Sequence, residues 1–323
     1  MNRVMEADSF EATGNLAVEE ALFDAHDGDA WLFLWRNDHV VVIGRNQNAW
    51  KECRVSLLES EGGQLVRRKT GGGAVYHDLG NLNFSFVVSR QAYDVTRQNA
   101  VIIRALDCLG LDAVQTGRND MVLANTGEKF SGSAFRIGER SCLHHGTILI
   151  AADMERLSRY LAPSPIKLQA KGIDSVRARV TNLRNHLPVV TVEDVMEALR
   201  AAFIREYGAA REMGRSELEG AHIAELQAGY ASWEWRFGNA PPFDAALQNR
   251  FEWGGIELML SLEHGRITGV KLYTDSLEAM LADDVQRALM GIPYAAKAMR
   301  AGLCTLPSGQ ARELGEWLGQ LAL

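Results

Sequence analysis

The chain has 323 residues, of which 47% are hydrophobic and 23% charged, a composition typical of a globular protein rather than a disordered, fibrous or membrane-spanning one. With 34 Lys and Arg against 41 Asp and Glu, the formal net charge is −7, so general attraction to nucleic acid or to an anionic membrane is not expected. Four cysteines without C-x-x-C spacing and an N-terminus without a signal-peptide core favour a reduced, cytoplasmic setting over a zinc ribbon or a disulfide framework.

The first hundred residues alternate between helix and strand patterns. Asn15 is predicted to cap a helix that runs through Phe23. Four apolar runs are predicted as strands, at residues 31–35, 40–43, 64–68 and 83–88. We expect the first two strands to pair as a hairpin, the last two to flank a glycine-rich loop, and a helix to follow at 101–109.

The middle of the chain continues the same large unit. Residues 114–150 contain short strands separated by turn signals, which predicts a meander that closes a sheet. Thr191 and Asp194 have the spacing of a capping box, and apolar residues then recur with a helical period to about Tyr207. We therefore expect a long amphipathic helix after the meander.

Two consecutive prolines, Pro241 and Pro242, mark the clearest boundary, because proline interrupts both helices and sheets. The length suggests two domains, which we place at residues 1–240 and 250–323, with a linker at 241–249. The prolines and the domain split motivate the hypothesis of a hinge at residues 239–249. In the second domain, alternating residues from Ile256 predict a hairpin with a turn at 263–266. Helical patterns at 277–289 and 308–321 complete a small α+β unit.

A glycine-rich loop carries the first chemical signal. Residues 67–69 are three cations, and after Thr70 come Gly71, Gly72 and Gly73, so backbone N–H groups can approach an anion without side chains in the way. The spacing fits neither a Walker A motif nor G-x-G-x-x-G. The alternatives are a phosphate-binding loop and a glycine-rich connection beside solvated cations.

Lys129 lies in a strand-like stretch beside small hydroxylated residues. Most isolated lysines are simply solvated. The functional alternative is a compact cation that bridges two negatively charged reactants, a carboxylate and a phosphate, which otherwise repel each other.

His144 and His145 are neighbours in a predicted strand, so their side chains point to opposite faces and do not readily share a metal ion. We expect one of them to line a site and the other to pack or to face solvent. Cys142 is the cysteine nearest to these histidines, and an inert thiol is favoured over a nucleophile.

A basic segment at residues 167–184 carries five cations, including Lys171 and Arg177, against one acid, Asp174. Its plain interpretation is a solvated surface. Its functional interpretation is contact with pyrophosphate or with an acidic protein partner.

Several stretches together resemble the lipoate-protein ligase A family of the bacterial two-domain type. They are residues 15–20, 42–50, 67–86, 117–120, 128–136, 144–150, 171–183, 232–238 and 253–255. Because these stretches occur in order over nearly the whole chain, the resemblance is far more specific than any single motif.

The resemblance implies an α+β chain. Its large catalytic domain would have mixed β-sheets flanked by helices, in the biotin/lipoate ligase fold that is similar to class II synthetases, and a small α+β C-terminal domain would follow. It implies that ATP and Mg²⁺ activate (R)-lipoate to lipoyl-AMP with release of pyrophosphate, and that the lipoyl group then passes to a lysine of a lipoyl domain. The implied partners are E2 subunits of 2-oxoacid dehydrogenases and the glycine cleavage H protein, with no nucleic acid or membrane partner; we expect a monomer.

The site residues follow from the same resemblance. It implies that Lys129 is catalytic and bridges the lipoate carboxyl group and the α-phosphate. Nucleotide binding is implied for Arg68, Gly73, Ala74, Val75, Tyr76 and Lys129. Lipoate binding is implied for Lys129, His77, His145 and Arg68, and weaker assignments are Asn81, Asp120, Lys171 and Arg177. No dedicated protein metal site is expected, since Mg²⁺ would arrive with ATP.

Two alternatives stay open from the sequence. One is an octanoyltransferase on the same fold, which works without ATP and, in related families, through a cysteine thioester, a role that Cys142 would have to fill. The other is a binding module that retains lipoate or protein affinity without activating the acid. Intact Lys129 and Arg68 argue against the second alternative.

Overall fold

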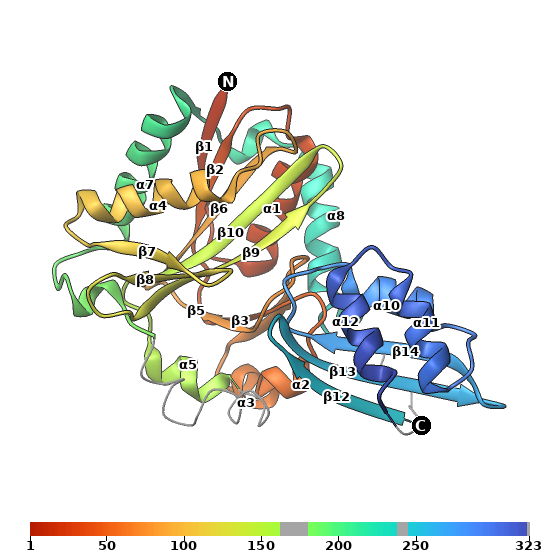
Figure 1. Cartoon of the computed structure of the whole chain (residues 1–323). Helices are drawn as coiled ribbons and strands as arrows, with labels where there is room; N and C mark the ends of the chain where they lie inside the picture. Colours follow the sequence, from red (N-terminus) through yellow and green to blue (C-terminus); the bar gives the residue numbers. More distant parts are fainter. Residues whose placement is uncertain (162–179, 238–244, 322–323) are drawn as a thin grey trace.

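An eight-stranded mixed sheet forms the centre of the large unit (Figure 1). The computed structural model describes residues 1–161, 180–237 and 245–321. In spatial order the strands are β11 (Ala210–Glu212), β1 (Asn2–Glu6), β2 (Trp31–Trp35), β6 (Asn81–Ser89), β10 (Ser141–Leu149), β9 (Lys129–Ile137), β8 (Asp120–Leu123) and β7 (Ala113–Thr116). Strand β1 pairs in parallel with β11 and β2, and the other pairs are antiparallel.

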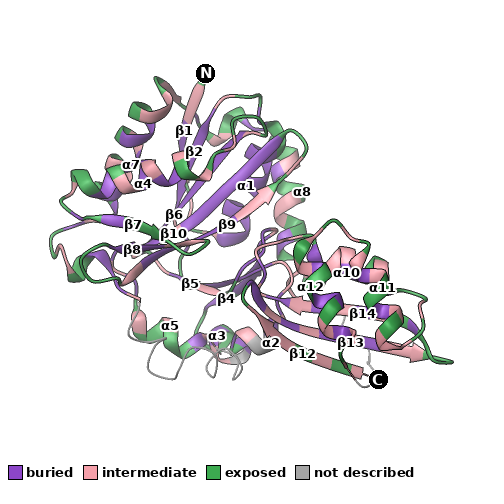
Figure 2. Ribbon diagram, in the orientation of Figure 1, coloured by how far each residue is buried: buried purple, intermediate pink, exposed green. Residues whose placement is uncertain are grey.

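Helices cover both faces of this sheet because its strands alternate their apolar side chains. Leu32 and Leu34 of β2 join the core beneath α4 (Val95–Cys108) and α7 (Val192–Tyr207), whereas Phe33 and Trp35 face α1 (Ala12–Ala25) and α8 (Gly220–Ala231). Burial of each such side chain contributes about 1.5–3 kcal/mol. Figure 2 shows β2, β6 and β10 as almost continuously buried.

A second sheet of three strands lies on the α1 side of the large sheet. Its order is β4 (Gln64–Arg67), β3 (Val40–Ile43) and β5 (Val75–His77). Its own helices are α2 (Ala49–Glu52), α3 (Val55–Ser60), α5 (Met154–Tyr160) and α9 (Trp233–Arg236). The glycine-rich loop joins β4 to β5, so it emerges where the two sheets face each other.

The predicted hairpin between residues 31–35 and 40–43 is wrong. Strand β2 belongs to the large sheet, and β3 pairs with β4 and β5 in the second sheet. The segment between them is not a simple exposed turn. Asp38 is exposed, but Asn37 is fully buried and hydrogen-bonded to Asn15 and His77. Both strands are buried throughout, and separate sheets allow both faces of each strand to be covered.

The predicted cap of the first helix is also wrong. Helix α1 begins at Ala12, and the Glu11 carboxylate accepts hydrogen bonds from the backbone N–H groups of Thr13 and Gly14. Asn15 lies inside the helix, where its buried side chain donates to the Ser9 and Arg36 carbonyls. Its role is therefore tertiary rather than local.

The prediction that strands at 64–68 and 83–88 flank the glycine-rich loop is wrong for the second strand, because the unpredicted β5 directly follows the loop. Three other predictions are confirmed, namely the meander, the α+β class and the capping box. Strands β7 to β10 form an antiparallel meander beside β6, and the α+β class holds. Thr191 and Asp194 form the reciprocal capping box at the start of α7. Among the described residues, no helix combines the length and apolar character needed to cross a membrane.

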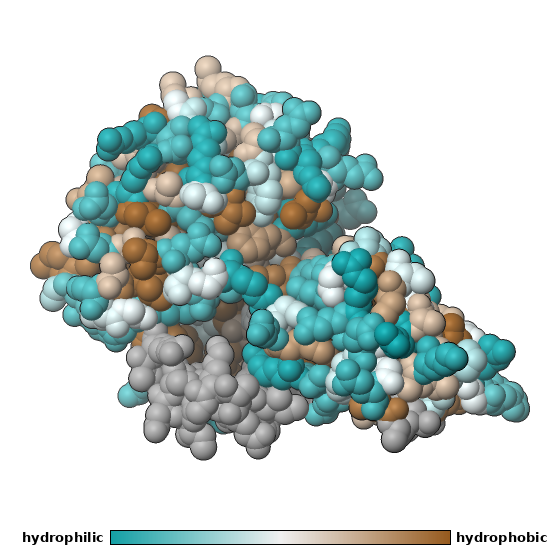
Figure 3. Space-filling view, viewed as in Figure 1, coloured by the Kyte–Doolittle hydropathy of each residue, from teal (hydrophilic) through white to brown (hydrophobic). Residues whose placement is uncertain are grey.

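The C-terminal unit has its own three-stranded antiparallel sheet with three helices on one face (Figure 1). Its elements are β12 (Ala245–Phe251), β13 (Gly254–Glu263), β14 (Arg266–Thr274), α10 (Leu281–Leu289), α11 (Ala296–Cys304) and α12 (Gly309–Leu318). The predicted hairpin is present as β13 and β14, whereas α11 was not predicted. Figure 3 shows a largely hydrophilic outer surface over these helices, which fits an apolar core enclosed within the unit.

Strand β12 begins at Ala245, inside the stretch that the sequence suggested as a linker, while Pro241 and Pro242 lie outside the described residues. In β12, Ala245 and Leu247 alternate with more exposed residues and pack on the core of the C-terminal unit. The period-two pattern is short and contains polar residues, which explains why the sequence did not reveal it. The exact domain boundaries stay a prediction.

Candidate active site

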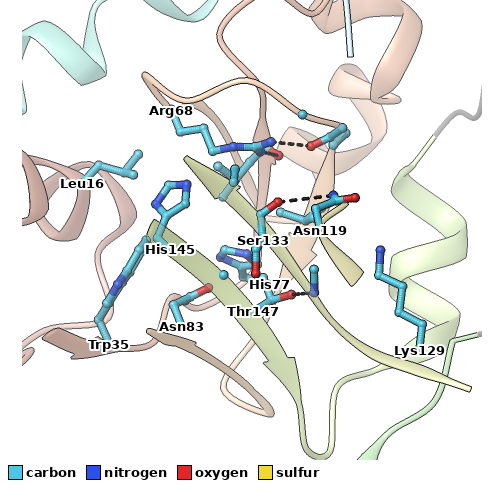
Figure 4. Close-up of a pocket in the computed structure, with 18 residues that line it drawn as sticks. Leu16, Trp35, Arg68, His77, Asn83, Asn119, Lys129, Ser133, His145 and Thr147 are labelled. Carbon is cyan, nitrogen blue, oxygen red and sulfur yellow. Dashed lines mark hydrogen bonds between the residues drawn. The ribbon is translucent and has the colours of Figure 1, made fainter. Parts of the chain in front are cut away.

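A cavity of about 150 Å³ lies between the two sheets of the large unit (Figure 4). The large sheet and α1 contribute Leu16, Trp35, Asn83, Asn119, Lys129, Gly132, Ser133, Ala134, His145, Gly146 and Thr147. The second sheet and its glycine-rich loop contribute Val42, Arg68, Gly72, Gly73, Ala74, Val75 and His77. Cross-strand register explains part of the lining, since Trp35 pairs with Asn83, and Asn83 pairs with Thr147.

The cavity is apolar at one side and carries a cation at the other. Leu16 and Trp35 lie across the pocket from Lys129 in Figure 4. Lys129 is 34% exposed, and its Nζ is 2.7 Å from Asp120 Oδ1. A bulge where β8 meets the start of β9 changes the register beside Lys129 and can redirect a side chain out of the ladder. Such a pocket suits a ligand with an apolar body and one anionic end.

Arg68 braces the glycine-rich loop from inside. It is buried, and its Nη2 donates to the carbonyl oxygens of Gly71 and Gly73 at 2.7 and 2.8 Å. Burial lowers the pKa of Arg68 to about 10, which leaves the guanidinium charged at neutral pH. Gly72 has a φ of +92°, a conformation that glycine adopts without steric cost. Arg68 therefore holds the loop in shape while it lines the pocket.

The neighbouring cations are also engaged by the protein. Arg67 donates to the carbonyls of Gln47 and Trp235 at 2.6 and 2.9 Å, and Lys69 forms an ion pair with Glu20. The interpretation of three solvated cations beside a loop is therefore wrong for this chain. Any anion would be met first by backbone N–H groups of the loop and by Lys129.

A chain of buried hydrogen bonds runs behind the pocket wall. The Trp35 indole N–H donates to Ser85 Oγ at 2.9 Å, and the Ser85 hydroxyl donates to the Glu19 carboxylate. His145 Nδ1 lies 2.8 Å from the same Glu19 oxygen, and His145 Nε2 lies 2.8 Å from Thr70 Oγ1. Glu19 thus fixes two pocket-lining side chains, Trp35 and His145.

The adjacent histidines divide as predicted. His145 lines the pocket, whereas His144 is fully buried on the other face of the strand. The His144 ring packs against Phe84, Phe86 and Phe135, and its Nδ1 lies 3.0 Å from Gln98 Oε1. Burial lowers the pKa of His144 to about 3. Strand alternation accounts for this division.

Three other predicted residues lie behind or beside the pocket. Tyr76 points away from it and packs against Tyr160 in the core of the second sheet, so only its backbone could serve a ligand. Asn81 is fully buried and donates to the side chain of Asn83, which does line the pocket. Asp120 reaches the site through its ion pair with Lys129.

Two predicted residues, Lys171 and Arg177, lie outside the described residues. Cys142 is fully buried among apolar core residues and does not line the pocket, and burial raises its pKa. A buried neutral thiol away from the ligand is a poor nucleophile, which argues against the thioester alternative. Within the described ranges, no group of three or more His, Cys, Asp or Glu side chains is placed to hold a metal ion.

The sequence missed the apolar wall of the pocket. Leu16 and Trp35 gave no signal beyond ordinary core residues, because their approach to the loop depends on how two separate sheets face each other. Thr70 and Glu19 were missed for the same reason, since they touch His145 from distant parts of the chain. A signal was available for Glu19, because it is a carboxylate in a helix whose residues are mostly apolar.

Two family descriptions match the chain. "Lipoyl protein ligase A/B catalytic domain" matches residues 11–204, and "Bacterial lipoate protein ligase C-terminus" matches residues 240–315. The first match covers all the described pocket residues. The second covers all three strands and the first two helices of the C-terminal unit, and most of the third.

Solved structures agree with these matches. LipL1 of P. falciparum, determined in complex with lipoate, is 27% identical with a TM-score of 0.89, over 99% of this chain and 100% of that one. A bipartite lipoate protein ligase of Thermoplasma acidophilum, described with its E2 lipoyl domain, is 31% identical with a TM-score of 0.66, over 76% and 99%. A lipoate-protein ligase A bound with ATP is 30% identical with a TM-score of 0.65, over 73% and 98%.

Proposed function

The chain belongs to the lipoyl protein ligase A/B family, and from that premise we propose that it attaches lipoate to proteins in two steps. In the first step a carboxylate oxygen of (R)-lipoate attacks the α-phosphorus of ATP, which forms lipoyl-AMP and releases pyrophosphate. In the second step a lysine amine of the acceptor protein attacks the acyl carbon. An amide bond forms, AMP leaves and the amine loses a proton.

The observation that carries this proposal is the position of Lys129 at the polar side of a largely apolar cavity. A carboxylate and a triphosphate repel each other, so their approach requires a cation between them. A lysine ammonium is compact and has three donors, which allows it to contact oxygens of both groups. In the described structure it is held by Asp120, so binding of lipoate and ATP exchanges one anionic partner for others.

The glycine-rich loop is the proposed nucleotide contact. A side chain at Gly73 would meet no heavy atom within 4 Å, so the backbone there is open to a ligand. Arg68 supports this loop and, with Ala74, Val75 and the backbone of Tyr76, completes the proposed nucleotide set. His77 and His145 line the proposed lipoate site, Asn81 acts through Asn83, and Lys171 and Arg177 stay as proposed contacts.

Mg²⁺ is proposed to enter with the triphosphate, where it would neutralise phosphate charge. Asp120 is the carboxylate nearest to Lys129 that could contact it, and carboxylate oxygens are suitable ligands. The proposed acceptors are lipoyl domains of 2-oxoacid dehydrogenase complexes and the glycine cleavage H protein. The T. acidophilum ligase described with its E2 lipoyl domain supports this class of partner.

The test is lipoate-dependent release of pyrophosphate from Mg-ATP before any acceptor protein is added. We expect release by the unchanged chain and a loss of at least about 100-fold in Lys129→Ala, because removal of a charge-stabilising donor costs about 2.7–4 kcal/mol in the transition state. Lys297→Ala, which removes an exposed lysine of α11, is the matched control.

Two results would reject the proposal. The first is the absence of pyrophosphate release while acyl transfer from an octanoylated carrier protein proceeds without ATP. The second is tight lipoate binding with no adenylate formed, which would identify a binding module.

A further inference from the structure

Two buried side-chain nitrogens on residues that line the cavity, His77 Nε2 and Asn83 Nδ2, have no protein partner in the described part of the chain. His77, at the end of β5, is 3% exposed and lines the pocket. Its Nδ1 is 3.2 Å from Asn37 Nδ2, whereas its Nε2 is buried without a hydrogen bond. Buried polar atoms are normally paired, so the pocket is built to receive a ligand atom that matches His77 Nε2.

Backbone carbonyls determine whether that nitrogen is a donor or an acceptor. The terminal side-chain nitrogen of Asn15 lies 3.1 Å from Ser9 O and 2.9 Å from Arg36 O. A carbonyl only accepts, so this atom is the amide nitrogen. Its two hydrogens face three acceptors, so one hydrogen is shared with Asn37 Oδ1, which lies at 3.0 Å. The other end of the Asn37 amide is then its nitrogen, which donates to His77 Nδ1. His77 therefore carries its hydrogen on Nε2.

The charge of His77 agrees with this tautomer. Burial and the nearby Arg68 and His145 lower the pKa of His77 to about 3. A second proton on Nδ1 would also face the N–H of Asn37. At neutral pH the ring is thus a neutral Nε2–H donor.

The donor lies on the apolar side of the pocket. The His77 ring meets the Trp35 ring edge to face, with centroids 6.4 Å apart. Trp35 lies across the pocket from Lys129 in Figure 4. If the ligand carboxylate binds at Lys129, as the proposed function requires, His77 meets a part of the ligand that extends from the carboxylate toward Trp35.

We propose that His77, held as the Nε2–H tautomer by Asn15 and Asn37, donates to a dithiolane sulfur of lipoate and so selects lipoate over octanoate. This inference rests on the proposed function. A sulfur is a weak acceptor, but the same end of octanoate has only C–H groups and leaves the N–H unpaired. A buried unpaired donor is costly, and we expect this contact to supply about a tenfold preference in kcat/KM.

The first experiment observes the tautomer directly. Two-dimensional ¹H–¹⁵N NMR of the ¹⁵N-histidine-labelled chain should show His77 with a protonated Nε2 and an unprotonated Nδ1 at neutral pH. Addition of lipoate should shift the Nε2–H signal more than addition of octanoate. A protonated Nδ1 overturns the proposal, as does an equal response to both acids.

The second experiment compares the two acids in pyrophosphate release. We expect His77→Leu to lower the lipoate-to-octanoate ratio of kcat/KM about tenfold and His77→Gln, which keeps an amide donor, to restore part of it. Asn37→Asp replaces the donor to Nδ1 by a carboxylate that only accepts, which forces the hydrogen onto Nδ1 and should lower the ratio as well. Equal losses for both acids overturn the sulfur contact and indicate a structural role or a contact with the acyl oxygen.

Failure of this inference is distinguishable from failure of the proposed function. If neither acid supports pyrophosphate release, the ligase function fails, and the NMR titrations still decide whether His77 Nε2–H responds to the lipoate ring. If both acids are activated with an unchanged ratio in His77→Leu, the ligase function stands and the selectivity role is wrong.

Discussion

The two units of the molecule bury different kinds of side chain. Around the pocket of the large unit, the buried residues include Asn15, Glu19, Arg68 and His77, each with polar partners. Among the described residues from 245 onward, the buried polar side chains are Thr274 and Ser276, and the rest of that core is apolar. Burying polar groups costs free energy unless they are paired, so they are retained where a ligand or another unit must be recognised.

The two exceptions in the C-terminal unit have side chains that are paired within that unit, where the Thr274 hydroxyl donates to the Gly255 carbonyl and the Ser276 hydroxyl donates to Gln310 Oε1. Their backbones meet the large unit. The backbone N–H of Thr274 donates to the carbonyl of Asn46 at 2.6 Å, and the carbonyl of Ser276 accepts from the N–H of Gly72 at 2.8 Å. Both lie where the C-terminal unit contacts the large one, beside the glycine-rich loop. A Cβ atom at Gly71 would come within 2.2 Å of the Ser276 carbonyl oxygen, so this contact also requires glycine.

Acid should destabilise the large unit more than the C-terminal one. His77 and His144 have pKa values lowered to about 3 by burial, whereas the unfolded value is about 6.5. Between those values the unfolded chain takes up protons that the folded chain does not. Each histidine therefore removes about 1.4 kcal/mol of stability per pH unit as the pH falls.

The measurement is the free energy of urea unfolding between pH 7 and pH 4.5, with His77→Gln against the unchanged chain. The variant should lose stability with a slope smaller by about 1.4 kcal/mol per pH unit. His264→Asn, at a histidine with 93% side-chain exposure, is the control and should keep the original slope. If the free energy of unfolding of His77→Gln falls with pH at the same slope as that of the unchanged chain, the lowered pKa of His77 is contradicted.

The apolar core of the C-terminal unit should give the next largest effect. Leu314 of α12 is fully buried, and its truncation to alanine should cost about 2–5 kcal/mol. Urea unfolding followed by tryptophan fluorescence measures this loss, with Met290→Ala, at a residue 44% exposed, as the control. Because Leu314 is remote from the pocket, pyrophosphate release per folded molecule should be unchanged. A loss of pyrophosphate release in the folded variant would show that the two units are coupled more closely than their separate cores suggest.

Removal of the Glu19 carboxylate tests the polar core of the large unit. Glu19→Ala leaves the His145 N–H and the Ser85 hydroxyl without their acceptor, which should cost about 1–3 kcal/mol. Glu19→Gln keeps an acceptor oxygen and should cost less. Urea unfolding compares both with Glu225→Ala, an exposed position on α8, and equal stability of Glu19→Ala and the unchanged chain would contradict the role of this network.

The smallest effect is expected at Cys142. Cys142→Ala removes a small buried group from the core and should cost about 1 kcal/mol. ATP-dependent pyrophosphate release should stay within about twofold, since the thiol does not line the pocket. Abolished turnover in a folded variant would restore the thioester alternative.

Local patterns were sufficient where short-range physics decides the structure. The Thr191 capping box, the β13 and β14 hairpin and the meander of β7 to β10 depend on neighbours in the sequence, and all were predicted. The division of His144 and His145 between core and pocket follows from the alternation of strand side chains. The family and the α+β class followed from ordered motifs along the chain.

Failures occurred where partners distant in the chain decide. Asn15 has the chemistry of a helix cap, yet Glu11 takes that role and Asn15 bridges two loops. Residues 31–35 and 40–43 look like a hairpin, yet each strand finds its partners in a different sheet. Local propensity was outweighed in both cases by burial, because a buried amide or a fully apolar strand must satisfy both hydrogen bonds and packing.

The sequence by itself determined which chemical groups are present: a glycine-rich loop, a lysine in a strand and two adjacent histidines. Only the tertiary structure decided how they are used. It turned Arg67, Arg68 and Lys69 toward protein partners, left Lys129 beside Asp120 at the rim of the cavity, and set His77 Nε2 in the pocket wall. The physical reason is that a side chain's hydrogen-bond partners and its burial depend on the groups packed against it. Those groups come from distant parts of the chain and meet only when the two sheets face each other.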